Sequence, residues 1–161
     1  MADFWDEMYL DEHLVDLEIE ASDNFSALAA LAGCLEKNQC VNGEFSRAIQ
    51  EREKEFSTGL PLEHVGVAIP HTDSEYVYKQ SMAIGILKEP VMFEMMGSPE
   101  VLVPVKIMFM LAIKEPKKQL EFLQALIDMF QKDEQVLAIV QAKTAAEAVK
   151  RMKPVSYTHL T

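Results

Sequence analysis

The alternation of apolar and polar residues in the segment LVDLEIEAS predicts a half-buried β-strand. Val15, Leu17 and Ile19 occur at every second position, and acidic residues separate them. A period of two places the apolar side chains on one face of a strand and the carboxylates on the other. We therefore expect the first strand here, with one face toward a core.

The next segments change to the spacing of amphipathic helices. Ser22 or Asp23 can cap a helix that runs to about Lys37, along which apolar residues recur every three or four positions. A second helix is expected over about residues 42–56. Residues 57–63, with the sequence STGLPLE, are typical of a turn. The first half of the chain is thus predicted to form a strand, two helices and a turn.

Short apolar runs in the middle of the chain predict several buried strands. Val65–Ile69 is one, and residues 81–88 are another. Residues 91–94 are a possible third, separated from the second by a Glu-Pro break. After a turn at the sequence GSPE, Val103–Ile113 has the length and β-branched content of a central strand.

Helices are expected again at the C-terminal end. Pro116 suits the first position of a helix that runs to about Phe130, and residues 133–142 predict a short helix. Thr144 and Glu147 form a capping box at the start of the last helix. The apolar face of the first of these helices is expected to consist of Leu120, Leu123, Ile127 and Phe130.

The order of these elements indicates an α/β fold. We expect a single domain, residues 1–153, in which a mixed β-sheet of about four to five strands is flanked by α-helices. Pro154 ends the last helix. Residues 154–161 are expected to be a tail that is disordered or foreign to the domain.

Charge and composition narrow the classes of function. The 161 residues include 26 acidic and 15 basic ones, which gives a formal net charge of −11. Such a surface repels phosphate backbones, so we expect no nucleic-acid binding. The longest apolar run is interrupted by Pro104 and Lys106, and the first residues are acidic where a signal peptide needs a basic start. We therefore expect a cytoplasmic protein with no direct membrane insertion.

The sequence lacks the common signatures of metal and nucleotide sites. No two of the four histidines have the i, i+4 spacing of a metal-binding helix, and no cysteine cluster supports them. The phosphate-binding patterns GxxxxGK[ST] and GxGxxG are absent, as is the GxSxG of serine hydrolases. We therefore predict neither a metal nor a cofactor.

His71 is the histidine with the strongest claim to a function. It follows a predicted buried strand directly, and Pro70 fixes the backbone at the exit of that strand. Functional groups of α/β folds concentrate where strands give way to loops. An ordinary imidazole, with a pKa of about 6.5, is mostly neutral and nucleophilic at pH 7. From local pattern alone, both a functional residue and an ordinary loop histidine remain open.

Arg52 provides an independent indication, because it lies on the apolar face of the second helix. It falls between Ile49 and Phe56 at helical spacing. A guanidinium is not buried without a partner, so it extends along the surface, pairs with a carboxylate, or lines an anion pocket. Near a histidine nucleophile, its fork of donors would suit a phosphoryl group.

Two separated motifs resemble a known family. The segment EREKEFSTGLP, followed by GVAIPHTDS, is similar to the signature of the fructose/mannitol-type IIA domains of the bacterial phosphoenolpyruvate:sugar phosphotransferase system. The strand VKIMFMLAI with the helix QLEFLQAL resembles the family too, and the similarity extends over about residues 14–152. The details HTDSEYV and KEPVMFEMMGSPE resemble the galactitol-type branch.

The resemblance implies a histidine phosphotransferase that carries phosphate for sugar uptake. His71 would accept phosphate on Nε2 from the phosphohistidine of the carrier protein HPr and pass it to a cysteine of the IIB component, which serves the IIC permease. Arg52 matches the active-site arginine of the family, and Thr58 lies in the neighbouring loop. The resemblance implies no metal and no nucleotide.

Gln119 is a departure from the family pattern, in which many members carry a second active-site histidine at this place. A glutamine can hydrogen-bond a phosphate oxygen or the His71 ring, but it cannot share charge or a proton. This leaves room for a different class of function, a regulatory binding module that reports its phosphorylation state to a partner protein. An α/β domain in which His71 has no function is the third alternative.

Overall fold

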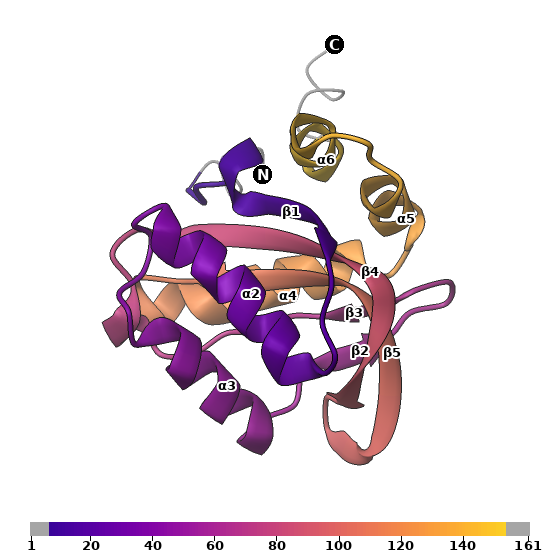
Figure 1. Ribbon diagram of the computed structural model, residues 1–161, viewed down its shortest axis with the longest axis horizontal. Coiled ribbons are helices and arrows are strands. Elements are labelled where there is room, and N and C mark those ends of the chain that lie inside the picture. Colours follow the sequence, from indigo (N-terminus) through magenta and orange to yellow (C-terminus); the bar gives the residue numbers. More distant parts are fainter. Residues whose placement is uncertain (1–6, 154–161) are drawn as a thin grey trace.

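A mixed sheet of five strands is the central layer of the computed structural model, which describes residues 7–153 (Figure 1). In spatial order its strands are β1 (Val15–Ile19), β4 (Ser81–Met95), β2 (Gly59–Pro61), β3 (Gly66–Ala68) and β5 (Ser98–Ala112), and β4 also pairs with β5. The predicted α/β fold is confirmed. The expected tail, residues 154–161, lies outside the described residues.

The strand directions place the end of β3 beside the end of β5. These two strands are parallel, with Ala68 opposite Met108. The segment after β3 and the segment after β5 therefore leave the sheet at the same edge. This relationship brings the loop containing His71 close to the start of the helix that follows β5.

The β4–β5 hairpin corrects two predictions from the sequence. The expected break at Pro90 is wrong, because β4 continues through it as one strand. The β4–β5 register is irregular between Ile86 and Val91, and a proline, which has no N–H, is tolerated where the ladder of hydrogen bonds is interrupted. The turn is also tighter than expected: Gly97 has a φ of 79°, and β5 already begins at Ser98.

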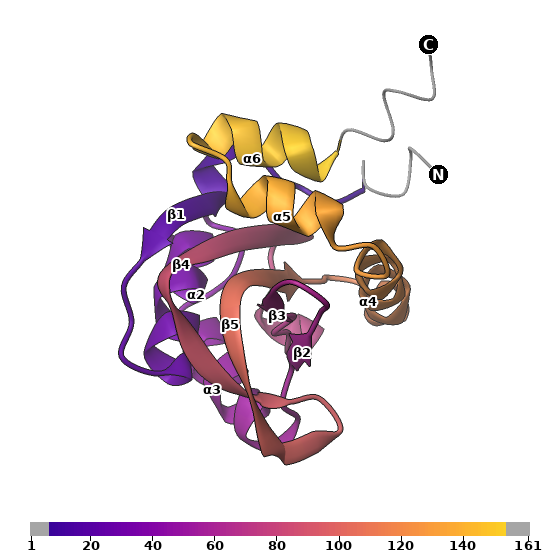
Figure 2. The same ribbon diagram turned by 90° about the vertical axis from the view of Figure 1, so that its right-hand side faces the viewer.

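The helices form layers on both sides of the sheet (Figure 2). Helices α2 (Asn24–Lys37) and α3 (Phe45–Glu55) lie on one side, whereas α4 (Pro116–Met129) lies on the other. Asp23, one of the two residues predicted as the cap of α2, occupies that position, and its carboxylate accepts the Ser26 N–H at 2.8 Å. Within residues 7–153, none of the helices has the length and hydropathy needed to cross a membrane.

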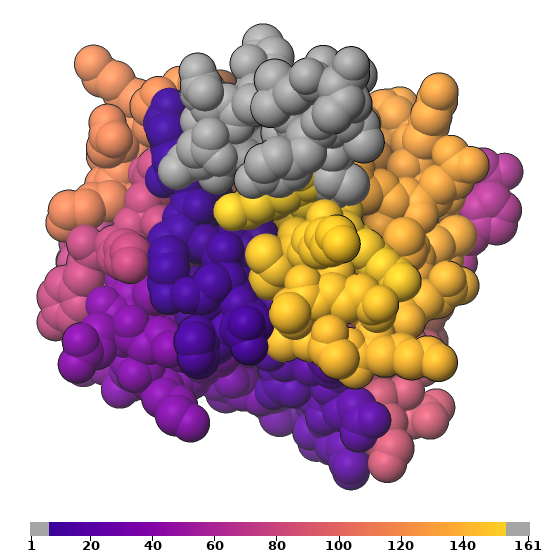
Figure 3. Space-filling view, turned by 90° about the horizontal axis from the view of Figure 1, so that it is seen from above, coloured from indigo at the N-terminus to yellow at the C-terminus, as the bar shows by residue number. Residues whose placement is uncertain are grey.

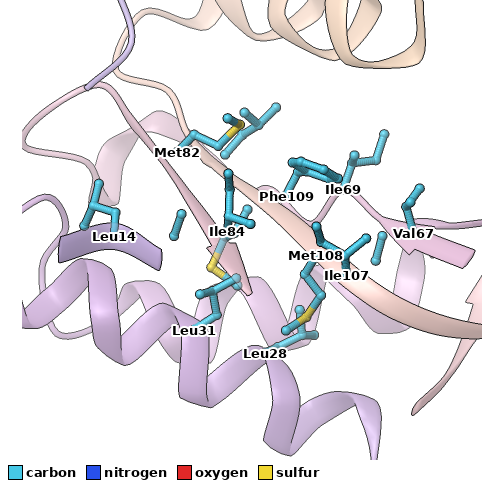
Figure 4. Close-up of a cluster of buried hydrophobic side chains, with 14 of the residues drawn as sticks. Leu14, Leu28, Leu31, Val67, Ile69, Met82, Ile84, Ile107, Met108 and Phe109 are labelled. Atoms are coloured by element: carbon cyan, nitrogen blue, oxygen red, sulfur yellow. The ribbon is translucent and has the colours of Figure 1, made fainter. Parts of the chain in front are cut away.

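A continuous apolar core fixes the sheet against α2. Leu28 and Leu31 of this helix point toward Ile84 of β4 and Met108 of β5, and all four side chains are buried (Figure 4). Burying side chains of this size contributes about 1.5–3 kcal/mol each. The core therefore holds the strands that carry the loop at His71 as one rigid unit.

The last two helices pack near the N-terminal part of the chain. Helices α5 (Glu134–Val140) and α6 (Ala145–Met152) are joined by the amide of Gln135, which donates to the Arg151 and Met152 carbonyl oxygens at 3.0 Å. Figure 3 shows α6, in yellow, beside the indigo segment that contains η1 (Glu12–Leu14) and β1.

The capping box predicted for α6 is present in part. The Thr144 hydroxyl accepts the Glu147 N–H at 3.0 Å, as expected. The Glu147 carboxylate accepts the N–H of Lys143, one residue before the predicted partner, at 2.7 Å.

The turn expected over residues 57–63 contains β2, a short strand that the sequence pattern did not predict. It pairs with β3 in antiparallel fashion, with Gly59 opposite Ala68. Added at Gly59, a Cβ atom would come within 2.8 Å of the Glu94 carbonyl oxygen, so the pairing with β4 requires glycine at this position. Only three residues take part, which is too few for a periodic signal.

Candidate functional site

His71 lies at the edge of the sheet, three residues after β3 ends. Two backbone hydrogen bonds hold the approach to it: the Ile69 N–H donates to the Thr58 carbonyl oxygen at 3.3 Å, and the Leu111 N–H donates to that of Pro70 at 3.0 Å. The chain before His71 is therefore anchored from two sides, and the position of the side chain is set by the sheet.

The ring of His71 is oriented by its own backbone. Its Nδ1 lies 2.8 Å from the Ile69 carbonyl oxygen, and since a carbonyl only accepts, Nδ1 carries the proton and donates. Burial lowers the pKa of His71, and the Arg52 charge lowers it further, while the bond to Ile69 acts in the opposite direction. The ring is thus neutral at pH 7, and Nε2 keeps its lone pair for chemistry.

Arg52 lies near His71 and is held by two contacts. Its NH1 is 3.6 Å from Oδ1 of Asp73, and its guanidinium carbon lies 4.6 Å from the centre of the Phe56 ring. Its Nε is shielded from solvent and has no hydrogen-bond partner among the residues described. A buried N–H without an acceptor costs free energy, because it has given up its hydrogen bonds to water.

The predicted residues His71, Arg52 and Gln119 meet in one open depression of about 590 Å³, to which α3, the loop after β3 and α4 all contribute. The depression is lined by Arg52, His71, Asp73, Ser74, Glu75, Pro116, Gln119, Leu120 and Leu123. The three predicted side chains come from sequence positions far apart, and the parallel arrangement of β3 and β5 brings them together. Their roles stay a prediction.

Exposed apolar side chains surround this depression. Leu120, expected on the buried face of α4, is instead 73% exposed, and Phe56 at the end of α3 is 56% exposed. The buried face of α4 is formed by Phe122 and Leu126. The prediction for Leu120 was wrong because helical spacing gives a stripe, but only tertiary packing decides which part of the stripe is covered.

Thr58, predicted as a supporting residue, does not line the depression. Its N–H and hydroxyl both donate to the Glu53 carboxylate, at 2.8 and 2.9 Å, in a buried position. Burial raises the pKa of Glu53 to about 7, although the two bonds from Thr58 oppose this shift. Thr58 therefore contacts the site only through its carbonyl oxygen, which accepts the Ile69 N–H.

Two residues near the site were missed from the sequence. Glu53 follows Ile49 at a spacing of four on α3, so the helical pattern could have placed it on the buried face. Asp73 follows His71 by two positions in a loop, and no periodicity indicates that it pairs with Arg52.

His64, another histidine that contacts a carboxylate, lies outside the depression. His64 donates its backbone N–H to Asp133 at 2.6 Å, and its Nδ1 is 3.1 Å from the same carboxylate. This pair raises the pKa of His64 and connects the β2–β3 loop to the start of α5. Across residues 7–153, no three His, Cys, Asp or Glu side chains are arranged to hold a metal ion.

A comparison with protein families places almost the whole chain in one of them. Residues 8–154 match the family described as "Phosphoenolpyruvate-dependent sugar phosphotransferase system, EIIA 2".

Curated relatives of the chain include a regulator and a transport component. It is 31% identical over 101 residues to the transcriptional regulator ManR of Bacillus subtilis, covering 63% of this chain and 14% of ManR. It is 29% identical over 102 residues to the galactitol-specific EIIA component of the phosphotransferase system of Escherichia coli K12, covering 62% of this chain and 66% of that protein. The chain thus matches a small part of ManR and about two thirds of the galactitol component.

The fold is also that of solved IIA structures. A chain in the complex of enzyme IIAMTL and phosphorylated enzyme IIBMTL from Escherichia coli superposes with a TM-score of 0.73 at 16% identity, covering 91% of this chain and 99% of that one. Together with the family match over residues 8–154, the fold and the residues around His71 lead to one conclusion: this chain belongs to the EIIA 2 family of the phosphoenolpyruvate-dependent sugar phosphotransferase system.

Proposed function

We propose that this chain is a IIA phosphocarrier of a bacterial sugar phosphotransferase system, acting in the cytoplasm. His71 accepts a phosphoryl group from phospho-HPr, and Arg52 stabilises the transferred group. The observation that carries the proposal is the state of His71: its Nδ1 is bound to the Ile69 carbonyl oxygen, and Nε2 is left free beside Arg52 in an open depression. Membership of the family supports phosphoryl transfer as the reaction.

The proposed step needs no proton transfer at Nε2. The lone pair of Nε2 forms the new N–P bond, while the N–P bond of the donor breaks and its electron pair returns to the donor nitrogen. The product ring retains its Nδ1–H, and the Ile69 carbonyl oxygen stabilises that protonated ring. When the N–P bond breaks in the next transfer, a ring that has kept its Nδ1 proton departs as a neutral imidazole. The hydrogen bond that holds this proton therefore also favours transfer to the next acceptor.

Positioning and charge stabilisation are the main requirements of phosphoryl transfer. The guanidinium of Arg52 lines the depression, and its planar fork of donors matches the oxygens of a phosphoryl group. Gln119 of α4, which also lines the depression, supplies an amide that can donate to a second oxygen.

A phosphocarrier must be reached by a donor protein and then by an acceptor protein, and the open depression around His71 allows both. We propose that the phosphoryl group passes from His71 to a cysteine of a IIB component, and through it supports uptake by the IIC permease. The exposed Leu120 and Phe56 offer apolar contact area to such partners. The similarity to a galactitol-specific EIIA component supports a galactitol-like sugar.

A second candidate is a regulatory module of the same fold. The match to part of ManR, a transcriptional regulator, favours it specifically. In this alternative His71 is phosphorylated, but its phosphoryl state changes the binding of a partner protein and is not passed to a IIB component.

One transfer assay separates the two candidates. The protein is labelled with phospho-HPr carrying radioactive phosphate, freed of HPr, and mixed with a galactitol-type IIB protein or with its cysteine-to-serine variant. Rapid movement of label to IIB, absent with the serine variant, is the result expected for a transport component. Label that stays on this protein in both mixtures supports the regulatory module, and a protein that HPr does not label at all contradicts both candidates.

A further inference from the structure

The depression around His71 has an unfavourable charge balance for a site that receives phosphate. Among the residues that line it, Arg52 is the one fixed cation, whereas Asp73 and Glu75 are both carboxylates. His71 is neutral at pH 7 and Gln119 carries no charge. The lining therefore has a net negative charge before any phosphoryl group arrives.

Asp73 is placed to affect Arg52 directly. Its Oδ1 is 3.6 Å from NH1 of Arg52, which is near enough for charge attraction but beyond normal hydrogen-bond length. The Asp73 side chain is 66% exposed and that of Arg52 is 33% exposed, so water screens the pair and its net strength is small. A loose pair of this kind can be displaced, but Asp73 cannot move far away because it lies two residues after the anchored His71.

We propose that Asp73 competes with the phosphoryl group for Arg52 and thereby raises the transfer potential of phosphorylated His71. This inference rests on the proposed function. While His71 is unmodified, Asp73 partly neutralises the guanidinium. Once the phosphoryl group is on Nε2, Arg52 turns its donors toward the phosphoryl oxygens, and the Asp73 carboxylate is left near a group of the same sign.

The charge that the phosphoryl group adds at His71 sets the expected size of the effect of Asp73 on the transfer equilibrium. Transfer brings a PO₃ unit with one net negative charge to Nε2, as the N–P bond forms there and the donor nitrogen recovers its electron pair. Repulsion between like charges a few ångströms apart at a wet surface changes an equilibrium constant by about three- to tenfold. Gln119 cannot offset this repulsion, because its amide has no charge.

The test compares Asp73→Asn with Glu75→Gln, which removes the same charge from the same depression without altering the pair at Arg52. Each protein is equilibrated with HPr and phospho-HPr, and the phosphorylated fraction is measured by ³¹P NMR at low and at high salt. We expect Asp73→Asn to shift the equilibrium about three- to tenfold toward the phosphorylated protein at low salt, and less at high salt, where exposed charges are screened. For Glu75→Gln we expect a smaller shift than for Asp73→Asn, because the Glu75 carboxylate repels the phosphoryl group but does not pair with Arg52.

The outcomes distinguish a failure of the proposed role of Asp73 from a failure of the proposed phosphocarrier function. An unchanged equilibrium in Asp73→Asn overturns the role of Asp73 while the parent's labelling still supports the proposed function. Equal shifts in both variants also overturn it, since total charge rather than competition for Arg52 would then be responsible. A parent protein that phospho-HPr does not label removes the proposed function itself, and this inference with it. Asp73→Glu, which retains the charge, is expected to behave like the parent.

Discussion

The Nδ1 atom of His71 lies 2.8 Å from the carbonyl oxygen of Ile69, two residues earlier in the same chain. This short-range bond defines the tautomer of the ring, and the sheet defines the position of its acceptor. Nε2 is consequently the ring nitrogen that can react in the depression beside Arg52. The chemistry proposed for His71 depends on this relationship more than on any other.

The pKa values of His71 and His64 should be shifted in opposite directions. Burial lowers the pKa of His71 below its ordinary 6.5, whereas pairing with Asp133 raises that of His64. In an NMR titration of the Cε1–H signals, the midpoint of His71 is expected below pH 6.5 and that of His64 above it. Phosphate acceptance should therefore begin to decrease at a lower pH than it would for a histidine with the ordinary pKa. A His71 midpoint above that of His64 would contradict the neutral, buried ring.

Arg52→Lys is expected to slow phosphate acceptance about tenfold, since one lost charge-assisted hydrogen bond costs roughly this much. Lysine keeps the charge but has neither the planar fork nor an atom equivalent to Nε. The free energy of unfolding should change by less than about 0.5 kcal/mol, because Arg52 is partly exposed. Stopped-flow transfer from phospho-HPr and urea denaturation measure the two effects.

Arg47→Lys is the matched control for Arg52→Lys. Arg47 is an exposed residue of the same helix and pairs with Glu44, away from the depression. Its variant should transfer at the parent's rate. If Arg52→Lys does so as well, Arg52 has no part in the site.

Gln119→His should prolong the lifetime of the phosphorylated state. A protonated imidazole at this position would add positive charge beside the phosphoryl group, which the amide cannot provide. Loss of phosphate with time, followed by ³¹P NMR, is expected to slow by a few fold at pH 6 and less at pH 8. Gln124→His, on the same helix but outside the depression, should leave the lifetime unchanged.

Glu53 should make the protein less stable as the pH rises, which is the opposite of the usual effect of a carboxylate. Its folded pKa of about 7 lies above the ordinary 4.5, so the folded state holds the proton more tightly than the unfolded state. Its contribution to stability is therefore full below pH 4.5 and is lost as the pH rises toward 7. The difference between the two pKa values corresponds to roughly 3 kcal/mol.

Glu53→Gln tests this contribution, because glutamine keeps hydrogen bonds to Thr58 but does not titrate. Urea denaturation at a series of pH values should show the parent losing more stability than Glu53→Gln between pH 5 and pH 8. Glu55→Gln, at an exposed position of the same helix, should follow the parent. Parallel curves for the parent and Glu53→Gln would mean that Glu53 titrates normally.

Much of the fold could be predicted because the sequence patterns that determine many of its helices and strands lie within single segments. The alternation at β1, the cap at Asp23 and the proline at the start of α4 all act within a few residues. Pro90 misled the prediction, because its cost depends on whether the partner strand needs an N–H at that point. The irregular register of β4 and β5 removes that need, and register is a property of two segments.

In the candidate site, as in the fold, the residues that could be singled out from the sequence are those with a local signal. His71 and Arg52 stood out locally, one after a buried strand and the other on an apolar helix face. Gln119 was identified only through the family resemblance, since a glutamine near a helix start is ordinary. The pairing of Asp73 with Arg52 depends on where the loop after β3 meets α3, and only the assembled structure contains that information.

The central claim is that phosphate enters and leaves through His71. The most direct measurement incubates the parent, His71→Ala and His64→Ala with phospho-HPr and locates the phosphoryl group by peptide mapping with mass spectrometry under non-acidic conditions. We predict one phosphoryl group on His71 in the parent and in His64→Ala, and none in His71→Ala when circular dichroism shows that variant to be folded. Labelling of His71→Ala at the parent's level, or a phosphoryl group on another residue of the parent, would contradict it.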